Sequence, residues 1–325
     1  MNQGAAAGTA PGPATNEKDP SVEGLVMPQS LLDDMVMIAD GLAFPEGPIA
    51  LGDGSVLVVE IERGTLTRVT PDGGREVVTE CGGGPNGAAI GPDGAVYICN
   101  NGGRWPNFTG GRIERVDLDT GQVDVLYERF DGRPLAGPND LVFDRSGDFW
   151  FTVTGKFRDV DRDFGEIYHA SPSGDRLVRV IERLDAPNGI GLSPDGGTLY
   201  FAESVTGRLY RRAIIGRGEV EPAVSNDPAT LVCGLPGLHF FDSLAVDVEG
   251  TICVGTLVSG RITAVSPDGS TVRQYRLPPP FEDPMPTNLC FGGPDRRTAY
   301  ITLSESGRLV SCPWPVAGLA LEFNR

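Results

Sequence analysis

The sequence has little of what several large classes of protein require. Its 325 residues include only two histidines, and no apolar run reaches the ~20 residues that a membrane-spanning helix needs. It contains no G-x-S-x-G elbow of a serine hydrolase and no P-loop. The first residues also lack the apolar stretch of a secretion signal, so we expect a cytoplasmic protein that does not cross a membrane.

The six cysteines form no arrangement that would bind zinc or build a disulfide framework. No C-x-x-C pair or metal-finger spacing occurs among them. Most lie in apolar runs that resemble strands, where a free cysteine behaves as a small hydrophobic residue. We therefore expect all six to be reduced.

Basic residues are scarce. Lysine and arginine number 27 against 44 aspartates and glutamates, which gives a net charge of −17. This charge repels phosphate backbones and anionic headgroups, so nucleic acid and membrane surfaces are poor partners. The acidity could concentrate cations, or it could serve solubility alone.

Residues 1–30 are rich in alanine, glycine, proline and threonine and show no periodic apolar pattern. Such a segment cannot bury enough surface to offset its ordering entropy, so we predict a disordered tail. The remaining chain, residues 31–325, is expected to form a single domain.

One short motif is repeated six times in this domain. It is clearest in the stretch from Gly84 to Gly94, GPNGAAIGPDG, where a polar residue is followed seven positions later by an Asp-Gly pair. The repeated polar residues, called the ring residues below, are Glu46, Asn86, Asn139, Asn188, Asp242 and Asn288. Successive ring residues are 40 to 54 positions apart, a period typical of propeller blades.

Each repeat has the same internal order of short strands. A strand with alternating apolar residues, such as Leu141 and Phe143, follows the ring residue and ends at a turn of an acidic residue and glycine. A second strand, rich in aromatic and β-branched residues, precedes a third that opens with glycine and a weaker fourth. The pattern predicts an all-β fold, a six-bladed β-propeller of four-stranded antiparallel blades with a central channel.

The sixth repeat shows only three clear strands. The short apolar stretch from Met35 to Ile38 is the better candidate for its outer strand, since both chain ends would then close the ring. Residues 317–323 are the alternative.

In a propeller the first strand of each blade lines the channel, so the ring residues should bring six side-chain oxygens together. The carboxylates of Glu46 and Asp242 would repel each other there unless a cation lay between them. An all-oxygen set suits a hard cation such as Ca²⁺ or Mg²⁺, with Mn²⁺ as a further candidate. The alternative interpretation is that these Asn-Gly and Asp-Gly pairs only form turns.

Four longer motifs carry a resemblance to a known family. They are Phe44-Pro-Glu-Gly-Pro48, Gly137-Pro-Asn-Asp140, the stretch from Ala186 to Gly196, and Asp242-Ser-Leu-Ala-Val-Asp247. In this order and spacing, from about residue 36 to residue 312, the chain resembles the SMP-30/gluconolactonase family of six-bladed propellers. That family includes sugar lactonases and organophosphate-hydrolysing relatives with a divalent metal, usually Ca²⁺, at the channel mouth.

The resemblance implies one divalent metal ion, with Ca²⁺ first and Mg²⁺, Mn²⁺ or Zn²⁺ as alternatives. The ligands that it implies are Glu46, Asn139, Asn188 and Asp242. It also implies that Asp242 is the catalytic base or nucleophile. Asn86 and Asn288 are expected at the same height, in contact with substrate or water.

Further candidates for contact with substrate lie in loops near the channel mouth. They are Asn100, Asn101, Arg104, Trp105, Phe157, His239 and Phe241. The aromatic residues could equally pack the loops, and His239 could also shuttle a proton to or from Asp242. Gly137 replaces an arginine of animal sugar-lactonase relatives and Val153 replaces an acidic residue of many relatives, which predicts a less polar pocket than a sugar lactone requires.

The expected function is hydrolysis of a lactone or similar ester, with Asp242 and a divalent cation as the chemical centre. The alternatives are phosphotriester hydrolysis at the same site and a non-catalytic binding scaffold with a structural metal. His169, the other histidine, lies on a third strand remote from the channel and is expected to be structural.

Overall fold

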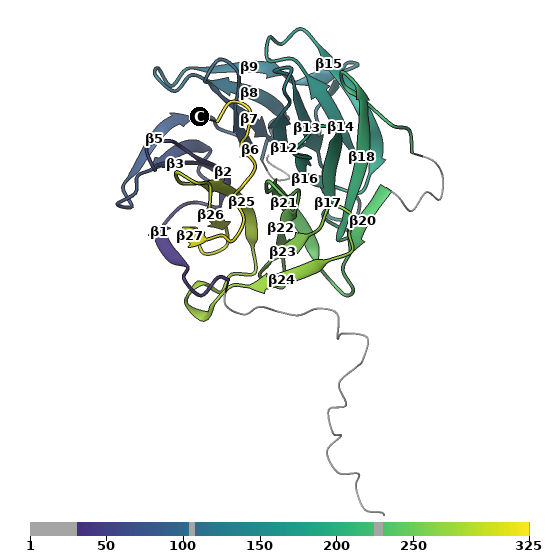
Figure 1. The fold of residues 1–325 in the computed structure, drawn as a ribbon. Helices are drawn as coiled ribbons and strands as arrows, with labels where there is room; N and C mark the ends of the chain where they lie inside the picture. Colours follow the sequence, from purple (N-terminus) through teal and green to yellow (C-terminus); the bar gives the residue numbers. More distant parts are fainter. Residues whose placement is uncertain (1–30, 104–107, 224–229, 325) are drawn as a thin grey trace, which may run out of the picture.

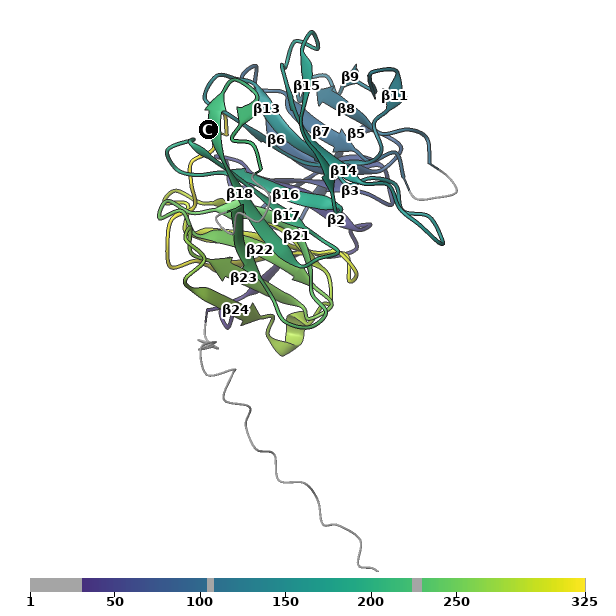
Figure 2. The same ribbon diagram turned by 90° about the vertical axis from the view of Figure 1, so that its right-hand side faces the viewer.

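The computed structural model describes residues 31–103, 108–223 and 230–324, which form six antiparallel sheets arranged as blades around a channel (Figure 1). Figure 2 shows neighbouring sheets, such as β16–β18 and β21–β24, packed face to face. The predicted six-bladed propeller is confirmed. The predicted disordered tail, residues 1–30, lies outside the described residues.

The first three blades each contain four strands, which follow one another from the channel outward. The first blade consists of β2 (Pro45–Ala50), β3 (Val56–Glu60), β4 (Thr65–Val69) and β5 (Arg75–Glu80). The second consists of β6 (Pro85–Ile90), β7 (Val96–Asn100), β8 (Arg112–Val116) and β9 (Val123–Tyr127). The third consists of β12 (Pro138–Phe143), β13 (Phe149–Val153), β14 (Gly165–Ala170) and β15 (Leu177–Leu184).

The other three blades follow the same plan with two variations. The fourth consists of β16 (Pro187–Leu192), β17 (Thr198–Glu203), β18 (Arg208–Gly216) and β20 (Leu231–Gly234). The fifth consists of β21 (Phe240–Val246), β22 (Ile252–Leu257), β23 (Arg261–Val265) and β24 (Val272–Arg276). The sixth consists of β25 (Pro286–Gly292), β26 (Thr298–Leu303), β27 (Arg308–Pro313) and β1 (Val36–Ala39).

The first variation is a fifth strand in the fourth blade. The long β18 continues into a hairpin with β19 (Glu219–Val220), so this sheet departs from the predicted four strands. A separate small hairpin joins β10 (Arg129–Phe130) to β11 (Arg133–Pro134), and one 3₁₀ turn, η3 (Pro279–Phe281), precedes β25.

The second variation is the closure of the ring. Strand β1 pairs antiparallel with β27, with Val36 opposite Ser311 and Met37 opposite Val310. The prediction that the N-terminal stretch supplies the outer strand of the sixth blade is therefore confirmed. The alternative segment, residues 317–323, instead runs over the ends of the inner strands (Figure 1).

The hydrophobic core is divided among the spaces between neighbouring blades. Between the second and third blades, Tyr97, Phe143 and Phe149 form a cluster whose ring centroids lie 5.0 to 5.8 Å apart. The alternating apolar residues of each inner strand supply one wall of such a space, which is why the strands show period-two patterning. Aromatic second strands supply the other wall.

All six cysteines are free, as predicted, and five of them are buried. In the described part of the chain, no helix is both long and apolar enough to span a membrane.

Candidate functional site

The six ring residues lie near the beginning of the inner strands, and all six strands are irregular at this point. In β2 the pairing with β3 shifts between Glu46 and Ile49, and in β21 the pairing with β22 shifts between Phe241 and Leu244. Strands β6, β12, β16 and β25 shift in the same region. A β-bulge re-aims the side chains beside it, so the shifts set how the ring residues face the channel.

Glycines directly after three ring residues bring the inner strands together. A Cβ atom on Gly47 would lie 2.5 Å from the carbonyl oxygen of Asn86, and one on Gly87 would lie 2.5 Å from that of Asn139. Gly189 repeats this arrangement against the following blade. The absence of a side chain at these three positions therefore allows neighbouring inner strands to approach each other closely.

The ring side chains are withdrawn from solvent, with only 2% to 8% of each residue exposed. Glu46 is held through Oε2, which accepts hydrogen bonds from Nδ2 of Asn288 at 2.8 Å and from the backbone N–H of Gly47 at 2.9 Å. Oδ1 of Asn188 accepts a longer hydrogen bond from Oγ of Ser243, at 3.4 Å. The ring is thus a buried polar layer in which only some of the side chains are hydrogen-bonded to one another.

The two carboxyl groups of the ring influence each other. Burial raises the pKa of Glu46 from 4.5 to about 7, although hydrogen bonds from Asn288 and Gly47 oppose the change. Burial, followed by the negative charge of Glu46, raises the pKa of Asp242 well above its ordinary value. Such an effect requires Asp242 to lie near enough to Glu46 to feel its charge.

Asp140 adds a third buried carboxyl group that sequence reasoning did not assign to the site. Its Oδ1 accepts the backbone N–H of Leu141 at 2.9 Å, and burial and the charge of Glu46 raise its pKa to about 8. The repeat could have indicated this residue, because Asp140 directly follows a ring residue, at the position where three other blades carry glycine.

Two ring oxygens have no partner among the described residues. They are Oδ1 of Asn86 and Oδ1 of Asn139, and an unsatisfied buried oxygen is costly. In the described ranges no three His, Cys, Asp or Glu side chains form a metal-binding group by themselves. A cation here would therefore need amide oxygens beside Glu46 and Asp242, and this donor set fits a hard divalent ion.

The loops that lead into the ring are fastened by buried side chains at the ends of second strands. Oε2 of Glu60 accepts the backbone N–H of Ala43 at 2.6 Å, and Oε1 of Glu203 accepts that of Asp185 at 2.8 Å. Asn100 fastens the loop of the second blade in the same way, so it has a structural role here. We call Glu60, Asn100 and Glu203 the latch residues.

Two residues that directly follow latched N–H groups have a left-handed backbone. Phe44 has φ = 57° and Ala186 has φ = 56°, and each precedes a proline and then a ring residue. A left-handed conformation is unfavourable for residues other than glycine, and such strain is often found at functional sites. The latches therefore fix a strained approach to Glu46 and Asn188.

The structure places the remaining predicted substrate contacts in different surroundings. Asn101 is half-buried and its Oδ1 accepts the backbone N–H of Gly103, and Nδ1 of His239 lies 3.2 Å from Oγ of Ser259. Both residues belong to loops at the ring end of the blades, and Phe157 is exposed in another such loop. Arg104 and Trp105 lie outside the described residues.

Two expectations about the pocket wall do not agree with the packing. Phe241 is fully buried between the fourth and fifth blades, in the cluster that includes Leu209 and Val254, which favours a packing role over substrate contact. Val153 is buried in the core between the second and third blades. Val153 ends the second strand of its blade, as the latch residues end theirs. Its side chain faces the core, so the lack of an acidic residue at this position does not change the polarity of a pocket wall.

His169 is remote from the ring. It is fully buried, its Nε2 lies 3.0 Å from Oδ2 of Asp144, and its Nδ1 lies 2.7 Å from Nη1 of Arg176. Because a guanidinium can only donate, Nδ1 must accept, so the Nε2–H tautomer donates to Asp144. The contacts agree with the predicted structural role.

Comparison with known proteins gives the site a family context. Residues 44–305 match the family model described as SMP-30/Gluconolactonase/LRE-like region. A gluconolactonase of Zymomonas mobilis is 29% identical over 189 residues, which cover 52% of this chain and 51% of that relative. The lactonase drp35 of Staphylococcus saprophyticus is 27% identical, over 83% of this chain and 78% of its own length.

Solved structures show the same fold. A gluconolactonase of Xanthomonas campestris, 23% identical, superimposes with a TM-score of 0.70 over 92% of this chain and 94% of its own. A calcium-binding regucalcin of Agrobacterium tumefaciens, 22% identical, gives a TM-score of 0.68 over 87% of this chain and 94% of its own. The family model covers most of the chain and every ring residue. The chain therefore belongs to the SMP-30/gluconolactonase/LRE-like family.

Proposed function

We propose that this chain is a metal-dependent hydrolase that opens a lactone or a similar cyclic ester. The observation that carries the proposal is a ring in which two carboxyl groups, Glu46 and Asp242, are buried together with the unpartnered amide oxygens of Asn86 and Asn139. The relatives named gluconolactonase and lactonase drp35 support the class of substrate.

The residues that would hold the cation are Glu46, Asn139, Asn188 and Asp242, with Ca²⁺ as the first candidate. When bound, the cation supplies positive charge that polarises a carbonyl group and stabilises the oxyanion formed from it. The two carboxylates would neutralise a dication. The unpartnered Oδ1 of Asn139 supports its assignment as a ligand.

Asp242 provides the proton transfer that hydrolysis requires. As base, its carboxylate takes a proton from water while the water oxygen bonds to the carbonyl carbon of the lactone. The ring C–O bond then breaks, and the departing alkoxide receives that proton, which yields a hydroxy acid. As nucleophile, Asp242 would instead bond to the carbonyl carbon itself, and water would release the product in a second step.

Phosphotriester hydrolysis is the second candidate. Diisopropyl-fluorophosphatase of Loligo vulgaris is 28% identical over 62% of this chain and 66% of its own length. The same carboxyl pair could serve attack on phosphorus in place of a carbonyl carbon.

Titration of released acid tests both candidates. The full chain is assayed against panels of lactones, esters and phosphotriesters in a pH-stat, with saturating Ca²⁺ and with EDTA. Turnover that EDTA abolishes and Ca²⁺ restores is the expected result, and the preferred panel decides between the candidates. If none of the three panels is turned over with Ca²⁺ present, the proposal fails and the alternative of a binding scaffold is favoured.

A further inference from the structure

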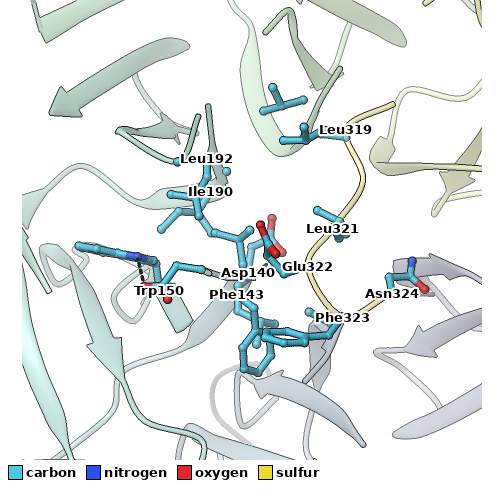
Figure 3. Close-up of a pocket in the computed structure, with 18 of the residues that line it drawn as sticks. Asp140, Phe143, Trp150, Ile190, Leu192, Leu319, Leu321, Glu322, Phe323 and Asn324 are labelled. Atoms are coloured by element: carbon cyan, nitrogen blue, oxygen red, sulfur yellow. Dashed lines mark hydrogen bonds between the residues drawn. The ribbon is translucent and has the colours of Figure 1, made fainter. Parts of the chain in front are cut away.

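A large cavity extends from the ring along the inner strands toward the turns at which these strands end. It has a volume of about 470 Å³. Gly47, Asp140 and Asn288 line its end near the ring, and the C-terminal segment, residues 319–324, lines the opposite end (Figure 3). We call this cavity the lower chamber. Its size lies in the range of small-molecule sites.

The walls of the lower chamber are mainly apolar. Inner-strand residues that line it include Ile49, Ala88, Ile90, Val142, Ala245 and Cys290. Figure 3 shows Ile190, Leu192 and Leu321 around the open space. Of the four ring residues expected to hold metal, none lines the chamber, so the ring separates it from the proposed reaction site.

The charged groups around the lower chamber do not favour an anionic ligand. Arg145 donates to the carbonyl oxygens of Pro194 and Asp195 at 2.8 and 2.9 Å, and it pairs with Glu322. Arg217, the other cation in the lining, is paired with Asp148 at 2.5 Å. Both guanidinium groups are thus already occupied, whereas carboxylates of the lining would repel a negative charge.

The cover of the chamber is fastened firmly at only one end. The backbone N–H of Val248 donates to Ala317, and that of Leu319 donates to Val246. Farther along, the segment is held by the exposed Arg145–Glu322 pair and by the edge-to-face packing of Phe323 on Phe143. An exposed ion pair contributes little and Leu321 is exposed, so the main cost of moving residues 320–324 aside is the packing of Phe323.

We propose that the lower chamber is a second ligand site, which takes an uncharged, apolar small molecule that enters beneath the C-terminal segment. Apolar cavities bind small apolar molecules because such ligands lose no hydrogen bonds when they leave water. A charged ligand would lose its hydration without gaining a free counter-charge. The site is independent of the proposed hydrolase activity, since it uses none of the expected metal ligands.

The test is a fluorescence titration of the full chain with N-phenyl-1-naphthylamine, an uncharged apolar probe. We expect one saturable site whose affinity is the same with Ca²⁺ and with EDTA. Ala245→Phe, which fills the chamber from β21, should weaken binding at least tenfold. Ala213→Phe is the matched control, because Ala213 is exposed on β18 and does not line the chamber.

Ile90→Phe fills the chamber from β6 and serves as a second variant if Ala245→Phe does not fold. Thermal melting establishes which variants are folded before titration. Unchanged binding in the folded filled variant, loss of binding in the Ala213→Phe control, or no saturable binding would overturn the proposal. Displacement of the probe by Ca²⁺ would show that the probe binds at the ring, and would overturn the proposal as well.

Discussion

Glu46 and Asp242 differ from the four asparagines of the ring in their response to pH. Their pKa values are raised in the folded protein, to about 7 for Glu46 by burial, and well above the ordinary value for Asp242 by burial and the charge of Glu46. The folded protein without metal therefore holds protons that the unfolded chain has lost. Stability that depends on these groups is present below the unfolded pKa and is lost as pH rises through the folded pKa.

The first prediction is that the metal-free protein becomes less stable between about pH 5 and pH 8, and that Ca²⁺ reverses the loss. Since a cation needs ionised carboxylates, Ca²⁺ should raise the melting temperature more at pH 8 than at pH 5. Calorimetric melting with EDTA and with Ca²⁺ measures both effects. An equal effect of Ca²⁺ at the two pH values would show that Glu46 and Asp242 do not bind it.

The second prediction concerns the chemical role of Asp242. Asp242→Asn removes the proton acceptor and keeps an oxygen in place, so kcat should fall by about 10²–10⁴. Calcium binding, measured by isothermal titration calorimetry, should persist with reduced affinity. Asp295→Asn, in an exposed turn at the other end of a blade, is the matched control. Near-normal kcat in Asp242→Asn would exclude Asp242 as base or nucleophile.

The sequence predicted which residues form the ring, but it did not predict which way their neighbours face. The spacing of the six repeats is enough to identify the ring residues. The direction of Phe241, by contrast, depends on the bulge beside it, and a shift of one residue turns side chains to the opposite face of a strand. A strictly alternating pattern therefore cannot distinguish a pocket wall from the core between blades.

At the scale of the strand, the approach to the ring depends on the latch residues. Glu203→Ala would leave the N–H of Asp185 without its acceptor, at a cost of about 1–3 kcal/mol in unfolding free energy. It would also release Asn188, so we expect weaker Ca²⁺ binding, measured by calorimetry. Glu203→Gln keeps an acceptor oxygen and should restore most of the affinity. Equal losses in the two variants would show that charge, and not the latch, matters.

The close approach of β2 and β6 leads to a fourth prediction. Gly47 and Gly94 both have positive φ, 48° and 79°, but a Cβ on Gly94 would meet no atom within 4 Å. Gly94→Ala should cost about 1–2 kcal/mol for its backbone alone. Gly47→Ala should cost about 1–3 kcal/mol more, because it presses on Asn86. Urea unfolding of both variants measures the difference, and equal costs would contradict a tight ring.

At the scale of the molecule, the number of blades could be predicted, but the path of the C-terminal segment could not. The repeat period fixes six blades, and the incomplete sixth repeat requires one strand from elsewhere. Residues 317–323 have a strand-like composition too, but their position is decided by contacts with other blades. The backbone N–H of Leu319 donates a hydrogen bond to Val246 of β21, and Phe323 packs on Phe143 of β12. A local sequence pattern does not predict such long-range contacts.

Closure by β1 leads to the last prediction. Deletion of residues 1–39 removes β1 together with the buried Leu32 and Met35, while deletion of residues 1–30 keeps them. Loss of these two side chains should cost about 3–6 kcal/mol. It should lower the melting temperature by about 10 °C or more.

The longer deletion also leaves β27 as an open sheet edge, and open edges promote aggregation. Size-exclusion chromatography should therefore show larger species for the longer deletion and an unchanged profile for the shorter one. A synthetic peptide of residues 31–40 added in trans should pair with β27 and raise the melting temperature again. If both deletions melt like the full chain, the sixth blade is stable with three strands, and the pairing of β1 with β27 is not what closes the ring.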